Sequence, residues 1–233
     1  QTPIVRLKDP IMGDRMANHV LSQILNFQLH LTTYFNFQTK KIWVDDLELL
    51  TPLQNKKITI GILGCGFLGT YIAKSLKKLD YKVIGYKKNK NNRSYNFPIY
   101  FNKKINEFIK LSNIIVVLLP STKDTKNFID KKFFSKMKKN SLLINVGRGV
   151  TLNEKDLIKH LQSNKNFFAS LDVFHKEPLP LNSKLWSHPN VIITPHIASI
   201  TVIESAVQQM YLRYKKFKKT GKIISDVNLK NGY

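Results

Sequence analysis

The sequence is poor in cysteine and contains no long hydrophobic run. Its one cysteine, Cys65, excludes an internal disulfide and favours a reducing, cytoplasmic location. No apolar run approaches the about 20 residues that a membrane helix needs, and the first residues show no signal-peptide pattern. We therefore expect a cytoplasmic protein with no membrane partner.

Acidic residues are also scarce, because 15 Asp and Glu stand against 38 Lys and Arg, for a formal net charge of +23. A chain this basic can bind nucleic acid. However, the lysines are scattered through every expected element, often beside asparagine, and no element concentrates them among aromatic side chains. We favour a general drift of surface positions towards lysine and asparagine, and we expect no nucleic-acid partner.

A glycine motif stands directly after an expected strand. Residues 58–63 are rich in Ile and Leu, the pattern G-x-G-x-x-G follows with Gly64, Gly66 and Gly69, and residues 67–79 have helical spacing. In this setting the first glycine permits a tight turn, the second lets a pyrophosphate approach the backbone, and the third lets the helix pack against the strand. An ordinary glycine-rich turn is the alternative, but the flanking pattern favours a dinucleotide site on the helix N-terminus.

The rest of the chain alternates expected strands and helices. Apolar runs without polar alternation, such as residues 114–119, are typical of strands that are covered on both faces. The expected strands are 58–63, 82–86, 97–101, 113–119, 141–145, 168–172 and 191–194, and the expected helices after the first strand are 67–79, 103–111, 130–137, 154–163 and 201–219. This order predicts an α/β protein with a Rossmann-type doubly wound parallel sheet.

A long helix is predicted over residues 15–35, with Asp14 as its N-cap. Its apolar residues form two neighbouring stripes, one through Val20 and Ile24 and the other through Leu21 and Leu25. Two stripes indicate two packing surfaces, which are the chain's own domain and the partner subunit of a homodimer. A helix that is fully buried within a monomer is the alternative.

The residues after the second expected strand distinguish the two nicotinamide cofactors. An NAD site needs a carboxylate about 20 residues beyond the motif, where it binds the ribose 2′-OH. Lys87 and Lys88 stand there instead, with Lys90 and Arg93 close behind. These cations suit the 2′-phosphate of NADPH. The general lysine excess is an alternative explanation for the cations, but it does not explain the missing carboxylate, so we expect NADPH/NADP.

Three further segments follow expected strands, at the edge where open α/β sheets bind ligands. They contain Arg148, Glu177 and His196. An arginine can hold a carboxylate and polarise a neighbouring ketone, and a histidine kept charged by a carboxylate can donate a proton as hydride reaches the carbon. Each of the three residues alone is more often structural, but together they predict reduction of a small 2-oxo acid. No cluster of His, Cys and Asp has the spacing of metal ligands, so we expect no metal site.

Four motifs, in their order along the chain, resemble those of the D-isomer-specific 2-hydroxyacid dehydrogenase family. They are the glycine turn, N-V-G-R-G at 145–149, L-D-V-F-x-x-E-P-L-P at 171–180 and T-P-H-I-A-S at 194–199. Further short matches along the chain resemble the branch of that family that reduces glyoxylate and hydroxypyruvate to glycolate and D-glycerate with NADPH. The resemblance implies that Arg148 binds and polarises the substrate, that His196 donates the proton, and that Glu177 is its partner.

The resemblance also implies a set of cofactor contacts. These are main-chain amides against the pyrophosphate, residues that line the cleft, and residues at the nicotinamide end: Phe67 and Leu68; Leu119 and Pro120; and Val146, Gly147 and Asp172.

Family members carry a further segment ahead of the position of Gln1, which forms most of a flavodoxin-like substrate domain. We therefore expect residues 1–13 to be the end of a truncated substrate domain, 14–198 to be the NADP-binding Rossmann domain, and 199–233 to return to the substrate domain. A chain without the rest of that domain would bind NADPH, reduce substrate poorly, and expose apolar surface on its C-terminal helix. The alternative function is a non-catalytic NADP-binding module.

Overall fold

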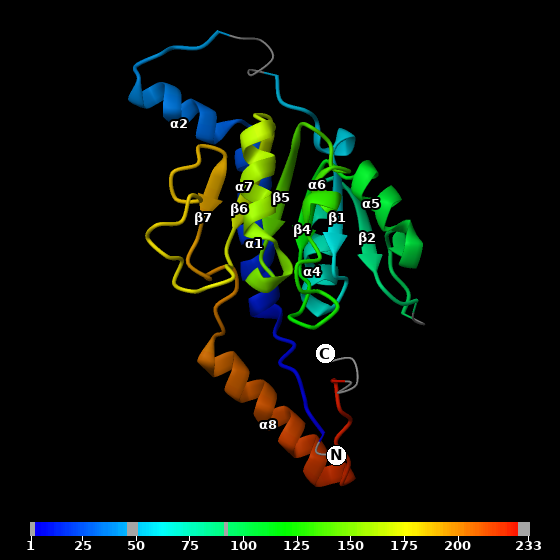
Figure 1. Ribbon diagram of the computed structural model, residues 1–233. Coiled ribbons are helices and arrows are strands. Elements are labelled where there is room, and N and C mark those ends of the chain that lie inside the picture. The colour runs from blue at the N-terminus through cyan, green and yellow to red at the C-terminus, as the bar shows by residue number, and fades with distance from the viewer. Residues whose placement is uncertain (1–2, 46–50, 91–92, 228–233) are drawn as a thin grey trace.

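The centre of the computed structural model, which describes residues 3–45, 51–90 and 93–227, is a seven-stranded parallel sheet (Figure 1). The strands are β1 Thr59–Leu63, β2 Lys82–Lys87, β3 Ile99–Phe101, β4 Ile114–Val117, β5 Ser141–Asn145, β6 Phe167–Leu171 and β7 Val191–Ile193. Their order across the sheet is β3-β2-β1-β4-β5-β6-β7, and every neighbouring pair is parallel. The predicted Rossmann-type doubly wound sheet is therefore confirmed.

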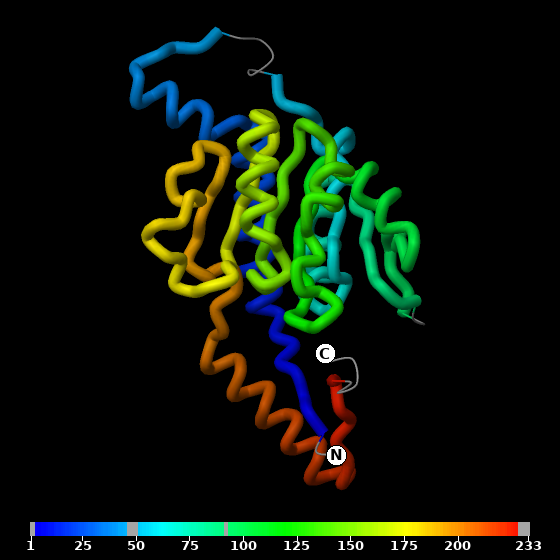
Figure 2. The backbone as a smooth tube through the Cα atoms, in the orientation of Figure 1, coloured from blue at the N-terminus to red at the C-terminus, as the bar shows by residue number. Residues whose placement is uncertain are grey.

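Helices cover both faces of this sheet (Figures 1 and 2). They are α1 Pro10–Gln28, α2 Leu31–Thr39, α4 Phe67–Lys77, α5 Ile105–Leu111, α6 Lys131–Phe134, α7 Glu154–Ser163 and α8 Ile203–Thr220, with short 3-10 turns η1 Asn55–Lys57, η2 Asn102–Lys104 and η3 Gly149–Thr151. One hydrophobic core lies under α5, α6 and α7, and a second lies under α1 and α4. In β4, Ile115 and Val117 point into the first core, whereas Ile114 and Val116 point into the second, which explains the missing polar alternation.

The start of the N-terminal helix differs from the prediction. Its N-cap is Asp9, not Asp14, and the Asp9 side chain accepts a hydrogen bond from the Ile11 amide at 2.9 Å. Pro10 follows at the first helical position, where its missing N–H leaves no bond unmade. Asp14 lies inside the helix, where its carboxylate accepts a hydrogen bond from the Tyr71 hydroxyl at 2.8 Å.

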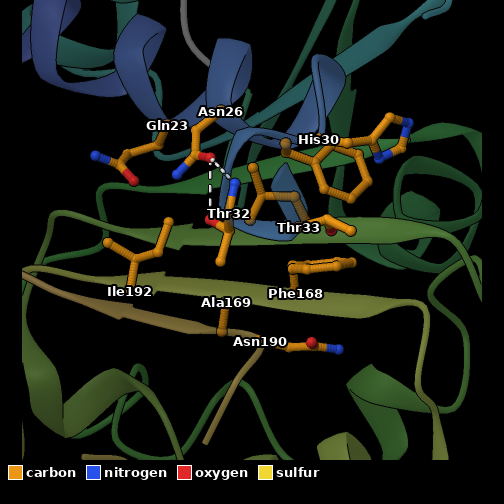
Figure 3. A pocket seen from close by; sticks show the side chains of 11 residues that line it. Gln23, Asn26, His30, Thr32, Thr33, Phe168, Ala169, Asn190 and Ile192 are labelled. Atoms are coloured by element: carbon orange, nitrogen blue, oxygen red, sulfur yellow. Dashed lines mark hydrogen bonds between the residues drawn. The ribbon is translucent and has the colours of Figure 1, made fainter. Parts of the chain in front are cut away.

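The predicted single helix over 15–35 is also divided in two. The break lies at His30, which adopts a left-handed conformation with φ 55°. Asn26 compensates for the break, because its Oδ1 accepts hydrogen bonds from the backbone amide and the hydroxyl of Thr32, both at 3.0 Å (Figure 3). The apolar periodicity continues across this corner, so the sequence pattern did not indicate the break between the two helices.

Segments near the two ends of the chain lie together, away from the sheet (Figure 1). The Asp226 amide donates to the Ile4 carbonyl at 2.8 Å, and the Asp226 carboxylate binds Lys8 at 2.6 Å and Arg213 of α8 at 3.2 Å. The division of the chain after residues 13 and 198 stays a prediction, and the outermost residues of the two outer segments, 1–2 and 228–233, lie outside the described residues.

The last helix, α8, ends before Gly221 as predicted, and this glycine caps it with φ 64°. Ala206 is its buried residue. By contrast, Ile203, Met210 and Leu212 are 74%, 62% and 58% exposed, which agrees with the expectation of apolar surface on this helix.

Candidate active site

The glycine turn connects β1 to the N-terminus of α4. Gly64 has φ 112°, in the left-handed region that side chains disfavour, and a Cβ on Gly69 would lie 2.2 Å from the Gly64 carbonyl oxygen. These two glycines are therefore required by the packing of the turn itself. A Cβ on Gly66, by contrast, would meet no described atom within 4 Å. The second glycine faces open space, as a pyrophosphate-binding glycine must.

The N-terminus of α4 fits a phosphate group. Gly66 is its N-cap and has no side chain to accept a hydrogen bond from the first turn. Within the described part of the chain, the amides of Phe67 and Leu68 have no side-chain acceptor. Free amides at a helix N-terminus, with the positive end of the helix dipole, bind anions. The turn therefore fits the pyrophosphate of a dinucleotide, as the motif predicts.

Two cations surround Tyr95 close to this turn. The Lys87 ammonium donates to the Tyr95 hydroxyl at 3.1 Å, and the Lys87 and Arg93 cations lie 5.8 and 5.5 Å from the ring centroid. The Tyr95 hydroxyl in turn donates to the carbonyl of Cys65 at 3.4 Å. Burial raises the pKa of the Cys65 thiol to about 12, so this residue is a neutral part of the turn.

Lys88, the second predicted cation, has a different neighbour. It forms an ion pair with Asp124 at 2.8 Å, in which the two side chains are 62% and 71% exposed. Lys87 and Arg93 are therefore the cations beside the turn, and Tyr95, which holds both of them, is a residue that the sequence reasoning missed. An aromatic residue two positions after Arg93 was the only signal for it.

The loop after β4 packs against both the glycine turn and the loop after β5. A Cβ on Gly64 would lie 2.9 Å from the Leu118 carbonyl oxygen, and one on Gly147 would lie 3.0 Å from backbone atoms of Leu119. Leu119 and Pro120 are half-buried at this edge. The Val146 side chain is buried in the core at 4% exposure, so Val146 offers a ligand only its backbone.

Asp172 holds the loop that carries His196. Its buried carboxylate accepts hydrogen bonds from the Thr194 hydroxyl at 2.6 Å and from the amides of Ile197 and Ala198, both at 2.9 Å. Its carbonyl oxygen accepts a fourth bond from the His196 amide at 2.9 Å. The predicted contact of Asp172 with the nicotinamide stays a prediction, and the structure adds this role in shaping the loop.

His196 and Glu177 form a hydrogen-bonded pair. The Nδ1 atom of His196 lies 2.7 Å from Oε2 of Glu177, while Oε1 of Glu177 accepts the Phe174 amide at 2.9 Å. Partial burial alone would raise the pKa of Glu177, but the hydrogen bonds from His196 and Phe174 outweigh it and lower this pKa. Glu177 is therefore an anion that orients the imidazole. His196 itself has φ 55°, a strained conformation of the kind found at functional sites.

Arg148 lies in the loop after β5, and its side chain is exposed. Its Nη1 donates to the Gly147 carbonyl at 2.7 Å. The next residue, Gly149, contacts the loop after β6, since a Cβ there would lie 1.9 Å from the Phe174 carbonyl. Because β5, β6 and β7 are neighbours in the sheet, Arg148, Glu177 and His196 share one edge, to which the glycine turn also belongs.

A small cavity lies at the opposite edge of the sheet, between the corner of α1 and α2 and the amino ends of β5, β6 and β7 (Figure 3). Its lining includes Asn26, Thr32, Phe168 and Asn190. Its volume of about 20 Å³ is room for a single water molecule. It is therefore not a cofactor site.

The described part of the chain contains neither a cluster of metal ligands nor a membrane-spanning helix. Nowhere in ranges 3–45, 51–90 and 93–227 do three or more His, Cys, Asp or Glu side chains form a group that could hold a metal ion. None of the helices described is both long enough and apolar enough to cross a bilayer.

Residues 21–198 match the family described as "D-isomer specific 2-hydroxyacid dehydrogenase, NAD binding domain". Over 231 residues the chain is 32% identical to glyoxylate/hydroxypyruvate reductase A of Yersinia enterocolitica, a match that covers 99% of this chain and 72% of that protein.

Solved structures agree with this match. A D-isomer specific 2-hydroxyacid dehydrogenase of Xanthobacter autotrophicus Py2, in complex with NADPH and MES, is 30% identical, with a TM-score of 0.91 over 100% of this chain and 95% of that one. The NADPH-dependent glyoxylate/hydroxypyruvate reductase of Sinorhizobium meliloti, in complex with NADP and sulfate, is also 30% identical, with a TM-score of 0.87 over 100% of this chain and 74% of that one.

Proposed function

Since the chain belongs to the D-isomer-specific 2-hydroxyacid dehydrogenase family of oxidoreductases, we propose that it reduces glyoxylate and hydroxypyruvate to glycolate and D-glycerate, with NADPH as the cofactor. The observation that carries the proposal is the Glu177–His196 pair at 2.7 Å, on the sheet edge that also holds Arg148 and the glycine turn. The substrates come from the relatives named above. The single buried thiol of Cys65 supports a cytoplasmic location.

Each catalytic side chain has a separate task in this reaction. The Arg148 guanidinium binds the carboxylate of the 2-oxo acid and polarises the carbonyl that will be reduced. The protonated form of His196, held through Nδ1 by Glu177, donates a proton from its other ring nitrogen to the carbonyl oxygen. Bound NADPH supplies the hydride that reaches the carbonyl carbon. The Glu177 anion stabilises the imidazolium before that transfer.

The cofactor would lie along the carboxyl edge of the sheet. The amides of Phe67 and Leu68 would hold the pyrophosphate over Gly66, and Lys87 and Arg93 would bind the 2′-phosphate. The rest of the cleft would be lined by Leu119 and Pro120, with the backbone of Val146 and Gly147 and with Asp172 at the nicotinamide end. Lys88 would reach the phosphate only in competition with its bond to Asp124.

The test of this function is NADPH consumption, followed by absorbance, with glyoxylate and with hydroxypyruvate as substrates. We expect turnover with both. NADPH binding without turnover would favour the second candidate, a non-catalytic NADP-binding module. The exposed apolar side chains of α8 favour that candidate, because Ile203, Met210 and Leu212 offer an apolar surface that a partner protein could bind. A chain that neither binds nor oxidises NADPH would contradict both.

Removing the two cations around Tyr95 is expected to weaken NADPH binding selectively. Hydrogen bonds to charged groups contribute about 1.5–3 kcal/mol each, so the double variant Lys87→Ala, Arg93→Ala should bind NADPH at least about 10-fold more weakly and NADH about as well as before. Lys88→Ala is the matched control and should have a smaller effect, because Lys88 pairs with Asp124. An equal loss of affinity for NADPH and NADH, measured by fluorescence titration, would contradict the assignment of Lys87 and Arg93 to the 2′-phosphate.

We also propose a homodimer through the region predicted as helix 15–35. Val20 and Ile24 of α1 are buried in the chain's own core, whereas Leu31 and Phe35 of α2 are 38% and 62% exposed and Trp43 is 95% exposed. Leu21 and Leu25, which form the second predicted stripe, are half-buried, and we propose that they contact the partner subunit together with these exposed side chains. Phe35→Glu should convert the dimer to a monomer in sedimentation experiments, whereas Lys40→Glu should not. A wild-type monomer at all concentrations would exclude the dimer.

A further inference from the structure

Glu154, the first residue of α7, contacts the loop that carries Glu177. Its Oε1 accepts a hydrogen bond from the backbone amide of His175 at 2.8 Å. The preceding amide, that of Phe174, donates to Glu177 itself at 2.9 Å. Two consecutive amides of one loop are therefore held by two carboxylates, one within the loop and the other on a helix.

The segment that leads to Glu154 begins at Arg148. The Thr151 hydroxyl, which is buried, donates to the Arg148 carbonyl at 2.7 Å. Gly149 lies so close to the Phe174 carbonyl that no side chain fits between them. This segment therefore contacts the Glu177 loop at two points, through Gly149 at its start and through Glu154 at its end.

We propose that Glu154 is a positioning residue, which fixes the loop that directs Glu177 towards His196 and keeps that loop in register with Arg148. The inference rests on the proposed function and adds a residue to it. A carboxylate that accepts an amide forms a charge-assisted bond, which is stronger than a neutral one. Without this bond, the only hydrogen bond that the described residues show for the amides of Phe174 and His175 is the one to Glu177, the group that has to be positioned. A displacement of about 1 Å is enough to lower a catalytic rate substantially.

A carboxylate in the first turn of a helix also stabilises that helix through its dipole. Asp156 separates the two effects. It lies in the same first turn of α7, and its Oδ2 accepts an amide hydrogen bond, from Lys131 at 3.0 Å. That bond leads to α6, away from Glu177. Asp156→Ala and Glu154→Ala therefore each remove one carboxylate and one amide bond, but only the second loosens the catalytic loop.

The experiment measures kcat/KM for NADPH-dependent glyoxylate reduction against pH, together with Tm, in the wild type, Glu154→Ala, Glu154→Gln and Asp156→Ala. We expect Glu154→Ala to lower kcat/KM about 10- to 100-fold. Glu154→Gln should restore most of the activity, because an amide oxygen still accepts the His175 amide. Asp156→Ala should lower Tm and leave kcat/KM unchanged.

The acid side of the kcat/KM profile against pH provides a second test of the role of Glu154. The Phe174 amide helps to lower the pKa of Glu177, and the other charged groups that act on this carboxyl are His196, which lowers its pKa, and Asp172, which raises it. A loosened loop weakens the Phe174 bond, so the pKa of Glu177 rises. Protonation of Glu177 then begins at a higher pH, and the acid limb of Glu154→Ala should move upward. The acid limb of the pH profile should lie at the same pH in Asp156→Ala as in the wild type.

An NMR titration of the Glu177 carboxyl in the same proteins is independent of turnover. A raised midpoint in Glu154→Ala alone supports the positioning role even if the wild type does not reduce glyoxylate, in which case the proposed function fails and the inference stands. The same midpoint and the same kcat/KM in Glu154→Ala and Asp156→Ala would overturn the inference and leave the proposed function intact.

Discussion

Replacing His196 with alanine is expected to reduce NADPH-dependent glyoxylate reduction by about 10²- to 10⁴-fold, the range that a positioned general acid contributes. The substitution removes the only predicted proton donor and leaves Glu177 without the partner that it holds at 2.7 Å. NADPH affinity should change little, because the glycine turn and the cations around Tyr95 do not contact this side chain. Steady-state kinetics and a cofactor titration measure the two effects separately.

The control for this experiment is His175→Ala. His175 lies in the Glu177 loop and its side chain is exposed, but only its backbone amide is used, as the donor to Glu154. This variant should keep nearly full activity. Equal losses in the two variants would show that the loop as a whole, and not the His196 imidazole, is what the reaction needs.

Gly149→Ala is expected to lower both stability and activity. The new Cβ would lie 1.9 Å from the carbonyl carbon and oxygen of Phe174 and 2.6 Å from the His175 nitrogen. These are backbone atoms, which cannot turn aside as the end of a flexible side chain can. Overpacking of this kind costs about 1–3 kcal/mol, which corresponds to a Tm lower by about 2–4 °C for each kcal/mol. Because the Arg148 and Glu177 loops are pushed apart, kcat/KM should fall as well.

Gly66→Ala makes the matched comparison. Its added Cβ meets open space, so the fold should lose no more than about 1 kcal/mol, as for an unfavourable N-cap. NADPH affinity should nevertheless fall, because the methyl group stands where the pyrophosphate would approach. A Gly149→Ala protein as stable as the wild type, or a Gly66→Ala protein that binds NADPH normally, would contradict the respective role. Thermal unfolding and a cofactor titration distinguish these outcomes.

The sheet was predictable because its signals are local. The uninterrupted apolar run of β4 and the glycine motif after β1 each lie within a few adjacent residues. The place of Arg148, Glu177 and His196 at one edge of the sheet was predictable for a related reason, since each follows a strand and parallel strands end at one edge. In all of these cases, the place of a residue in the sheet follows from the residues next to it in the sequence.

Features that depend on side-chain contacts between separate segments were not predictable. The corner at His30 depends on Asn26 capping α2, and the N-terminal cap is Asp9 where Asp14 was an equally suitable type of residue. Asp172 holds a loop more than 20 residues further along the chain, and Glu154 reaches His175 across a similar distance. Such bonds become visible only when the fold has brought the two segments together.

Most of the bonds that shape the reaction centre end on main-chain groups. Asp172 binds the amides of Ile197 and Ala198, Glu177 binds that of Phe174, and Glu154 binds that of His175. Every residue except proline supplies an amide, so the exposed positions Ile197 and His175 can exchange side chains without losing the bond, whereas Phe174 and Ala198 are also fixed by the core in which they are buried. A genome that steadily converts codons to lysine and asparagine could therefore rewrite the exposed positions of this neighbourhood and retain a working enzyme. Tolerance to mutation would then be high at exposed positions immediately beside the reacting atoms, and selection would act on the acceptors, the glycines and the buried side chains.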